Sequence, residues 1–104
     1  MATVAAPESI RRADRVETPE VLKVSSTSRP TSVAGAIAGI IRHSGRTELQ
    51  AVGAGAVNQA TKAIAIARRY LASDGIDIVC IPDFAIVSIA DQDKTALRLI
   101  VESR

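Results

Sequence analysis

The sequence predicts an α/β protein of the α+β two-layer type, in which two helices cover one face of a four-stranded mixed sheet. Three observations lead to this fold class: apolar and polar residues alternate at 20–26 and 46–52, a helical period follows each of these stretches, and two Ile- and Val-rich runs end the chain. The order is β-α-β-α-β-β. Right-handed crossovers place the first strands parallel and both helices on the same face of the sheet.

The first strand and helix lie between Glu20 and Gly45. Alternation in "EVLKVSS" predicts the strand, Pro30 is placed to open the helix, and Gly45 ends it. The predicted apolar face of this helix consists of Val33, Ile37, Ile40 and Ile41.

The opposite face of this helix is flat and carries glycine. Each helical glycine costs on the order of 1 kcal/mol relative to alanine, so such a face indicates that another backbone comes close. That backbone belongs either to the same chain, through helix packing, or to a subunit or ligand. The residues of this candidate contact surface are Gly35, Ala38, Gly39 and Arg42.

The second strand, "RTELQAV", leads through a glycine turn into a helix expected from about Ala56 to Ser73 and closed by Gly75. Its predicted buried stripe is Val57, Ala60, Ile64, Ala67 and Leu71, flanked by Ile66 and Tyr70. A polar, positively charged stripe lies opposite and consists of Asn58, Lys62, Arg69 and Ser73.

The last two runs, "IDIVCIPDFAIVSIA" and "TALRLIVES", predict an antiparallel hairpin joined by the polar turn "DQDK". Pro82 indicates an edge strand or a bulge within it. Residues 1–19 have two prolines, balanced charges and no sustained period, so we expect a flexible extension before a domain at 20–104.

Composition limits the functions that this chain can have. At 104 residues there is room for one domain, and a chain with one Phe, one Tyr and no Trp offers few platforms for base stacking. The longest apolar or glycine run, at 33–41, is far shorter than the roughly 20 residues that a membrane span needs. A lone cysteine and no secretory leader pattern favour a cytoplasmic protein.

Charge is distributed unevenly along the chain. From Lys23 to Arg69 seven basic residues stand against one acid, whereas from Tyr70 to the end three basic residues stand against six acids. One part of the surface should therefore attract polyanions while another repels them.

The residue types that catalyse reactions in enzymes form no recognisable constellation in this sequence. His43 is placed to interact with the last carbonyls of the first helix, and Cys80 among apolar neighbours is expected to be buried and inert. We expect no enzymatic activity, no cofactor and no metal site; Asp91 and Asp93 are turn residues.

The turn "AVGAGAVNQATKA" matches neither familiar nucleotide signature. Gly55 is followed by Ala56 rather than the Gly-Lys-Ser/Thr ending of a P-loop, and the third glycine of the dinucleotide pattern would fall at Asn58. Two interpretations remain: backbone amides at the helix start accept a phosphate, or the glycines serve a tight turn and close packing.

Long stretches rich in small residues resemble a known family. "LKVSSTSRPTSVAGAIAGIIR", "ELQAVGAGAVNQATKAIAIARRYLA", "IDIVCIPDF" and "LRLIVE" resemble the stage V sporulation protein S family, from about Val21 to Glu102. The resemblance implies an Alba-like fold, dimerisation and a nucleic-acid role. Relative to the Alba pattern, the lysine pair before the first helix is replaced by Ser28 and Arg29, and an Arg-Gly-Arg turn is replaced by Gly53, Ala54 and Gly55.

Two functional hypotheses follow. The first is a non-enzymatic homodimer or higher homo-oligomer that binds DNA or RNA with low sequence specificity and regulates sporulation or development. Its predicted nucleic-acid contacts are Arg29, Gly53, Gly55, Asn58, Lys62, Arg68 and Arg69. The alternative is a protein-interaction module that oligomerises or docks a regulatory partner through the glycine-bearing helix face.

Overall fold

The computed structural model describes residues 21–104 and contains a four-stranded sheet with the order β1-β2-β4-β3. The strands are β1 (Val21–Val24), β2 (Arg46–Ala51), β3 (Ile78–Ile89) and β4 (Gln92–Ser103). β1 and β2 are parallel, and β4 runs antiparallel to both β2 and β3. The extension predicted at residues 1–19 lies outside the described residues.

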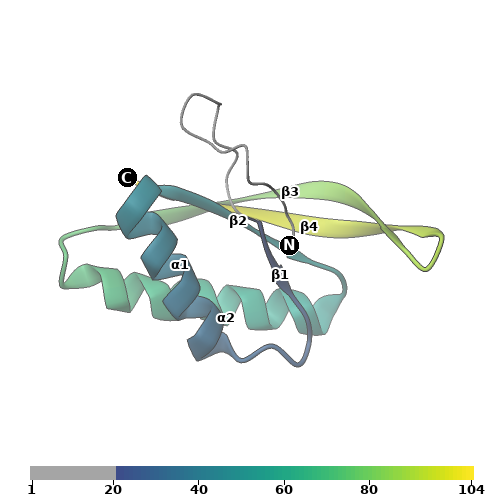
Figure 1. Cartoon of the computed structure of the whole chain (residues 1–104), viewed down its shortest axis with the longest axis horizontal. Helices are drawn as coiled ribbons and strands as arrows, with labels where there is room; N and C mark the ends of the chain where they lie inside the picture. The colour runs from purple at the N-terminus through teal and green to yellow at the C-terminus, as the bar shows by residue number, and fades with distance from the viewer. Residues whose placement is uncertain (1–20) are drawn as a thin grey trace, which may run out of the picture.

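Both helices pack on the same face of this sheet (Figure 1). α1 (Pro30–Ser44) begins at the predicted proline and ends at Gly45, whose φ of 80° is readily adopted by glycine. α2 (Ala54–Ala72) begins two residues earlier than expected, because Gly53, with a positive φ of 91°, already provides the cap position. The predicted fold class and the Alba-like element order are thus confirmed.

The core lies between the helices and the sheet and is built largely from small residues. Leu49 and Val101 are fully buried on the two central strands, and Leu71 is fully buried on α2. The buried face of α2 is rotated slightly from the predicted stripe toward the alanine residues of the helix, so that Val57 and Ile64 are only half-buried. Alanines let α1 and α2 approach each other closely, which is why the buried positions include Ala34, Ala38, Ala56, Ala60, Ala63 and Ala67.

The β3–β4 hairpin differs from its prediction in length. Pairing continues without a bulge from Ile78 opposite Ser103 to Ile89 opposite Gln92, so the turn is Ala90–Asp91 rather than "DQDK". Both turn residues have positive φ, 52° and 62°, as the two-residue turns of twisted hairpins require. The register therefore runs to the tip, and the hairpin projects past the N-terminal end of α2 (Figure 1). Pro82 is confirmed on an edge strand.

Cys80 is exposed, and the prediction that it is buried is therefore wrong. It lies on edge strand β3, opposite the buried Val101, where a side chain has strand neighbours on one side only. Partial desolvation still raises the pKa of the Cys80 thiol, so little thiolate forms at neutral pH.

Candidate functional site

In the turn before α2, the local geometry explains why each of the two positions is glycine. Gly53 adopts φ 91° and ψ 160°, a backbone conformation that is almost restricted to glycine. A Cβ atom on Gly55 would lie 2.9 Å from the Cβ of Ser26, closer than two such atoms pack. The close-packing interpretation is therefore correct for this turn, and it does not by itself exclude a phosphate contact.

Within residues 21–104, neither helix start is capped by a side chain of its N-cap residue. Neither Arg29 before α1 nor Gly53 before α2 makes a capping hydrogen bond, and neither first turn contains an acid. Gly53, Ala54 and Gly55 are all exposed. Free N–H groups and the positive end of the α2 dipole thus face solvent at this turn.

The loop between β1 and α1 is held in a fixed position beside α2. The Ser25 N–H donates to Ser28 Oγ at 2.9 Å, and the Ser28 N–H donates to the Ser25 carbonyl at 3.1 Å. Gln59 Nε2 on α2 donates to the Ser28 carbonyl at 2.9 Å. Sequence reasoning missed this bond, for which no local pattern exists. Its consequence is that the exposed Arg29 lies close to the first turns of α2.

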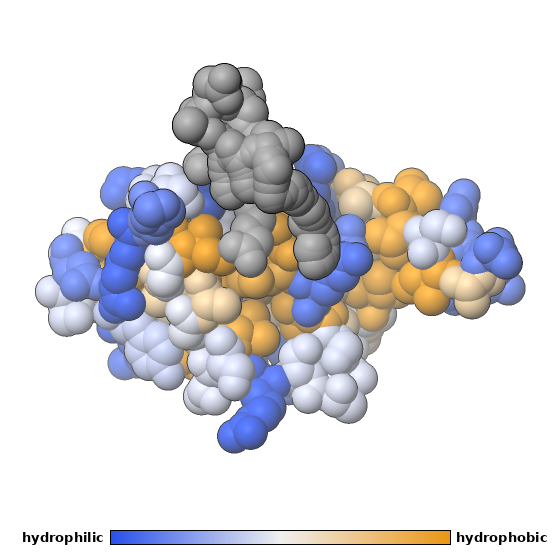
Figure 2. All heavy atoms as spheres, viewed as in Figure 1, coloured by the Kyte–Doolittle hydropathy of each residue, from blue (hydrophilic) through white to orange (hydrophobic). Residues whose placement is uncertain are grey.

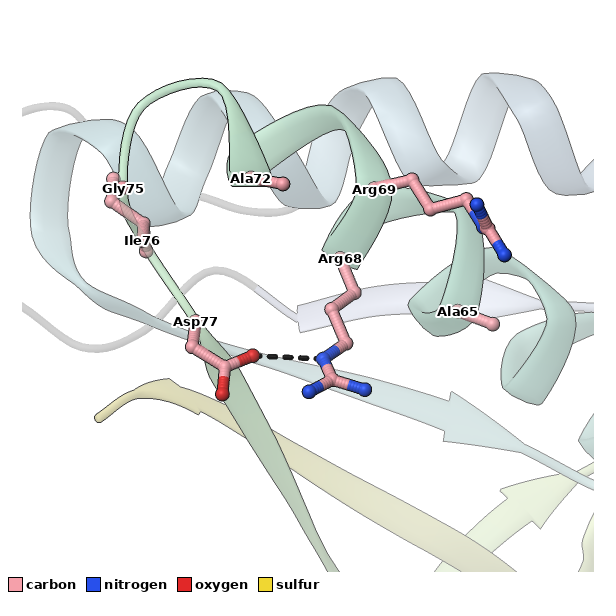
Figure 3. A pocket seen from close by; sticks show the side chains of 7 residues that line it. All are labelled: Ala65, Arg68, Arg69, Ala72, Gly75, Ile76 and Asp77. Atoms are coloured by element: carbon pink, nitrogen blue, oxygen red, sulfur yellow. Dashed lines mark hydrogen bonds and ion pairs between the residues drawn. The ribbon is translucent and has the colours of Figure 1, made fainter.

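The predicted polar stripe of α2 is on the surface. Asn58, Lys62 and Arg69 all reach solvent, and within residues 21–104 neither Lys62 nor Arg69 forms an ion pair. Arg69 extends away from the carboxylate of Asp77 (Figure 3). Arg29, Lys62 and Arg69 are accordingly three cations of the helix layer with no carboxylate partner in the described chain; we refer to them as the free helix-layer cations.

Arg68, predicted as a nucleic-acid contact, is already engaged by a carboxylate. Its Nε donates to Asp77 Oδ1 at 2.8 Å (Figure 3), while Arg104 reaches Oδ2 of the same carboxylate at 2.8 Å. The hydrogen bond from Arg68, followed by that from Arg104, lowers the pKa of Asp77 to about 2. The same hydrogen bond raises the pKa of Arg68. This pair lines one side of an open hollow of about 550 Å³ whose other residues include Ala65, Arg69, Ala72 and Gly75.

On the sheet face opposite the helices, two arginines of the central strands are paired with carboxylates. Arg46 pairs with Glu102 at 3.1 Å and with Glu48 at 3.3 Å, and Arg98 pairs with Asp83 at 3.3 Å. Acids and bases from β2, β3 and β4 therefore neutralise one another across this face. Sequence reasoning missed these pairs because they depend on strand order and register.

The candidate contact surface of α1 differs from its prediction at two points. Ala38 is buried and belongs to the core, because it lies one turn from Ala34 on the inward face. Gly35 and Gly39 are exposed, and among residues 21–104 a Cβ on either would meet no atom within 4 Å, so packing within the described chain does not explain them. Arg42 donates from Nε to Asp74 Oδ2 at 2.7 Å and thereby ties the end of α1 to the end of α2.

The described chain shows no arrangement that suggests a metal centre or a membrane span. No group of three or more His, Cys, Asp or Glu side chains comes together within residues 21–104. Over the same residues, no helix combines the length and apolar character needed to cross a bilayer.

Comparison with known proteins gives a match that covers the whole described domain. Residues 20–104 match the family described as Stage V sporulation protein S (SpoVS).

Proposed function

Because this chain belongs to the stage V sporulation protein S family, we propose that it is a cytoplasmic, non-enzymatic regulatory protein of sporulation that binds nucleic acid. The observation that carries the proposal is the group of free helix-layer cations. Arg46 and Arg98 on the open sheet face are paired with carboxylates, whereas the free helix-layer cations have no such partner in the described residues. A surface of this kind attracts a polyanion without distinguishing its sequence.

The proposed contact surface runs from the β1–α1 loop along the outer side of α2. Arg29 contributes from the loop, Lys62 and Arg69 from the helix, and Asn58 offers an amide to a phosphate or a base edge. The uncapped amides of Gly53 and Gly55 add neutral donors. Arg68 has a minor part in this proposal, because its guanidinium must first release Asp77.

Few phosphate contacts mean modest affinity and a shallow salt dependence. Each phosphate neutralised contributes about 0.9 to the slope of log K against log salt on duplex DNA. Three free helix-layer cations therefore predict a slope of about 3 per protomer, and binding should weaken steadily as salt rises.

The test is fluorescence anisotropy with labelled duplex DNA, single-stranded DNA and RNA over a salt series. Lys62→Glu combined with Arg69→Glu should lower affinity more than tenfold and reduce the slope by about 2. A matched control carries the same change of net charge elsewhere, Lys23→Glu with Lys94→Glu, on exposed residues of β1 and β4. Equal loss in both variants would show that net charge, rather than this surface, drives binding. Absence of binding by all three probes at low salt would end the proposal.

The glycine surface of α1 favours a second candidate function, a protein-interaction module. Gly35 and Gly39 each weaken the helix by about 1 kcal/mol, yet no atom of the described chain needs the space that they leave. A partner or another subunit docking on this face would use that space. Gly39→Leu should then abolish assembly measured by light scattering and leave polyanion binding unchanged. Retained assembly with this variant would refute docking at this face.

A further inference from the structure

The outer part of the β3–β4 hairpin carries large apolar side chains that the rest of the described chain leaves uncovered. Phe84 is 72% exposed and Ile86 is 68% exposed, and Ile81 and Ile89 are 48% and 44% exposed. The hairpin extends beyond the N-terminal end of α2 (Figure 1), and its surface there is apolar up to a polar tip (Figure 2). Exposed apolar surface of this extent usually marks an interaction site.

These four side chains lie on both faces of the hairpin. Phe84 pairs with Leu97, which packs against the core beneath the helices, so Phe84 and Ile86 are on the helix side of the sheet. Ile81 and Ile89, at odd spacing from Phe84, are on the other side. A partner that covers only one face would leave the second pair in water, so the edge of β3 between the faces is the natural point of contact.

The edge of β3 is open. In the order β1-β2-β4-β3, this strand of 12 residues has β4 as its one neighbour within the described sheet. Its outward N–H and C=O groups are a template for another strand. No lysine interrupts the stretch from Ile81 to Ile89, and Pro82 is the only proline in it.

The pattern of exposed residues is symmetric about Ala85. Phe84 and Ile86 lie one residue to either side of it, and Ile81 and Ile89 lie four residues to either side. We propose that two copies of this chain associate by pairing β3 with β3, antiparallel, about a two-fold axis at Ala85. Phe84 then lies opposite Ile86 of the second copy on the helix side, and Ile81 lies opposite Ile89 of the second copy on the other side.

This register leaves no uncompensated charge or long unpaired stretch. Asp83 falls opposite Val87 of the second copy, and its carboxylate already has Arg98 of its own chain as a partner at 3.3 Å. Pro82 has no N–H to donate, so it removes one ladder bond at each end and limits the pairing to the outer part of β3. The result is one continuous sheet formed by the four described strands of each copy.

The covered area fits a reversible dimer. With about 200 Å² for each large apolar residue, the exposed fractions of the four side chains amount to about 450 Å² per copy. Two copies bury about 900 Å², and the main chain and the side chains between them bring the total above the roughly 1,000 Å² of a specific interface. We assign a second copy of this chain as the partner, because the pattern of exposed residues reads the same in either chain direction, as a two-fold axis requires. An unrelated strand would gain nothing from this symmetry.

The test uses charges placed at the proposed facing pair. In sedimentation velocity at about 100 μM, wild type should show a species of twice the 10.9 kDa chain mass, whereas Phe84→Glu alone and Ile86→Lys alone should dimerise at least tenfold more weakly. An equimolar mixture of the two variants should restore the dimer. In the mixed pair the introduced carboxylate of one copy faces the introduced ammonium group of the other, while the remaining Phe and Ile also face each other.

A control variant distinguishes the β3 edge from the exposed surface of α2. Tyr70→Glu changes an aromatic residue on α2 that is 42% exposed and should leave the dimer intact. Circular dichroism of each variant checks that the chain is folded. A monomeric wild type, a dimer unaffected by Phe84→Glu, or a mixture that stays monomeric would each overturn the proposal. None of these outcomes depends on nucleic-acid binding.

Discussion

Replacing Gly55 with alanine should destabilise this protein, although the same change at Gly39 should stabilise it. Both glycines lie in helices, where alanine is favoured by about 1 kcal/mol. At Gly39 the new methyl group meets no atom within 4 Å, so the free energy of unfolding should rise by about 0.5 to 1 kcal/mol. At Gly55 it would lie 2.9 Å from Ser26 Cβ, and such overpacking costs about 1 to 3 kcal/mol.

The net expectation for Gly55→Ala is a loss of about 1 kcal/mol, because the overpacking exceeds the gain in helix propensity. The two variants should therefore differ by about 2 kcal/mol, or about 10 °C in Tm for a domain of this size. Urea titration and thermal melting at one protein concentration measure both values.

A double-mutant cycle identifies the cause. Ser26 is exposed, and Ser26→Gly removes the Cβ atom that the new methyl group of Gly55→Ala would meet. The double variant should therefore be more stable than the sum of the two single-variant effects predicts. If Gly55→Ala raises the Tm as Gly39→Ala does, the β1–α1 loop that contains Ser26 does not pack against the start of α2 as described. The position of Arg29 in the proposed contact surface would then lose its support.

Three further outcomes are expected. Arg68 and Arg104 hold the pKa of Asp77 at about 2, against an ordinary 3.8. The contribution of ionised Asp77 to the free energy of unfolding is therefore present above about pH 4 and is lost as the pH falls toward 2. Asp77→Asn should flatten that part of the pH dependence in urea titrations, and an unchanged curve would contradict the ion pairs. Gly53→Ala, at φ 91°, should lower the free energy of unfolding by about 1 to 3 kcal/mol, and a neutral effect would show that the turn relaxes freely. The exposed Cys80 should react with a thiol reagent without denaturant, faster as the pH rises toward its elevated pKa; a need for denaturant would mean that it is buried.

Element order and helix ends could be predicted because local chemistry determines them. Pro30 and Gly45 act through their own backbone preferences, and alternation in β2 reports which side faces the core. The helical period alone predicted the exposed stripe of α2, and Asn58, Lys62 and Arg69 lie on the surface as that period requires.

Contacts between residues that are distant in the sequence could not be predicted in this way. Arg68 and Asp77 lie nine residues apart, and Arg104 reaches the same carboxylate from the end of the chain. The glycine face of α1 and the burial of Ala38 likewise depended on where α2 lies. Periodicity gives the direction of a side chain relative to its own element, but not what stands opposite.

By itself, the sequence determined the family, the β-α-β-α-β-β order and the presence of an excess of basic residues before Tyr70. Only the tertiary structure decided which of those cations are paired and which are free, and that the hairpin extends beyond the helices with Phe84 and Ile86 exposed. The physical reason is the range of the interactions. Backbone propensity and periodicity act over a few residues, whereas ion pairing and burial depend on the packing of the whole chain.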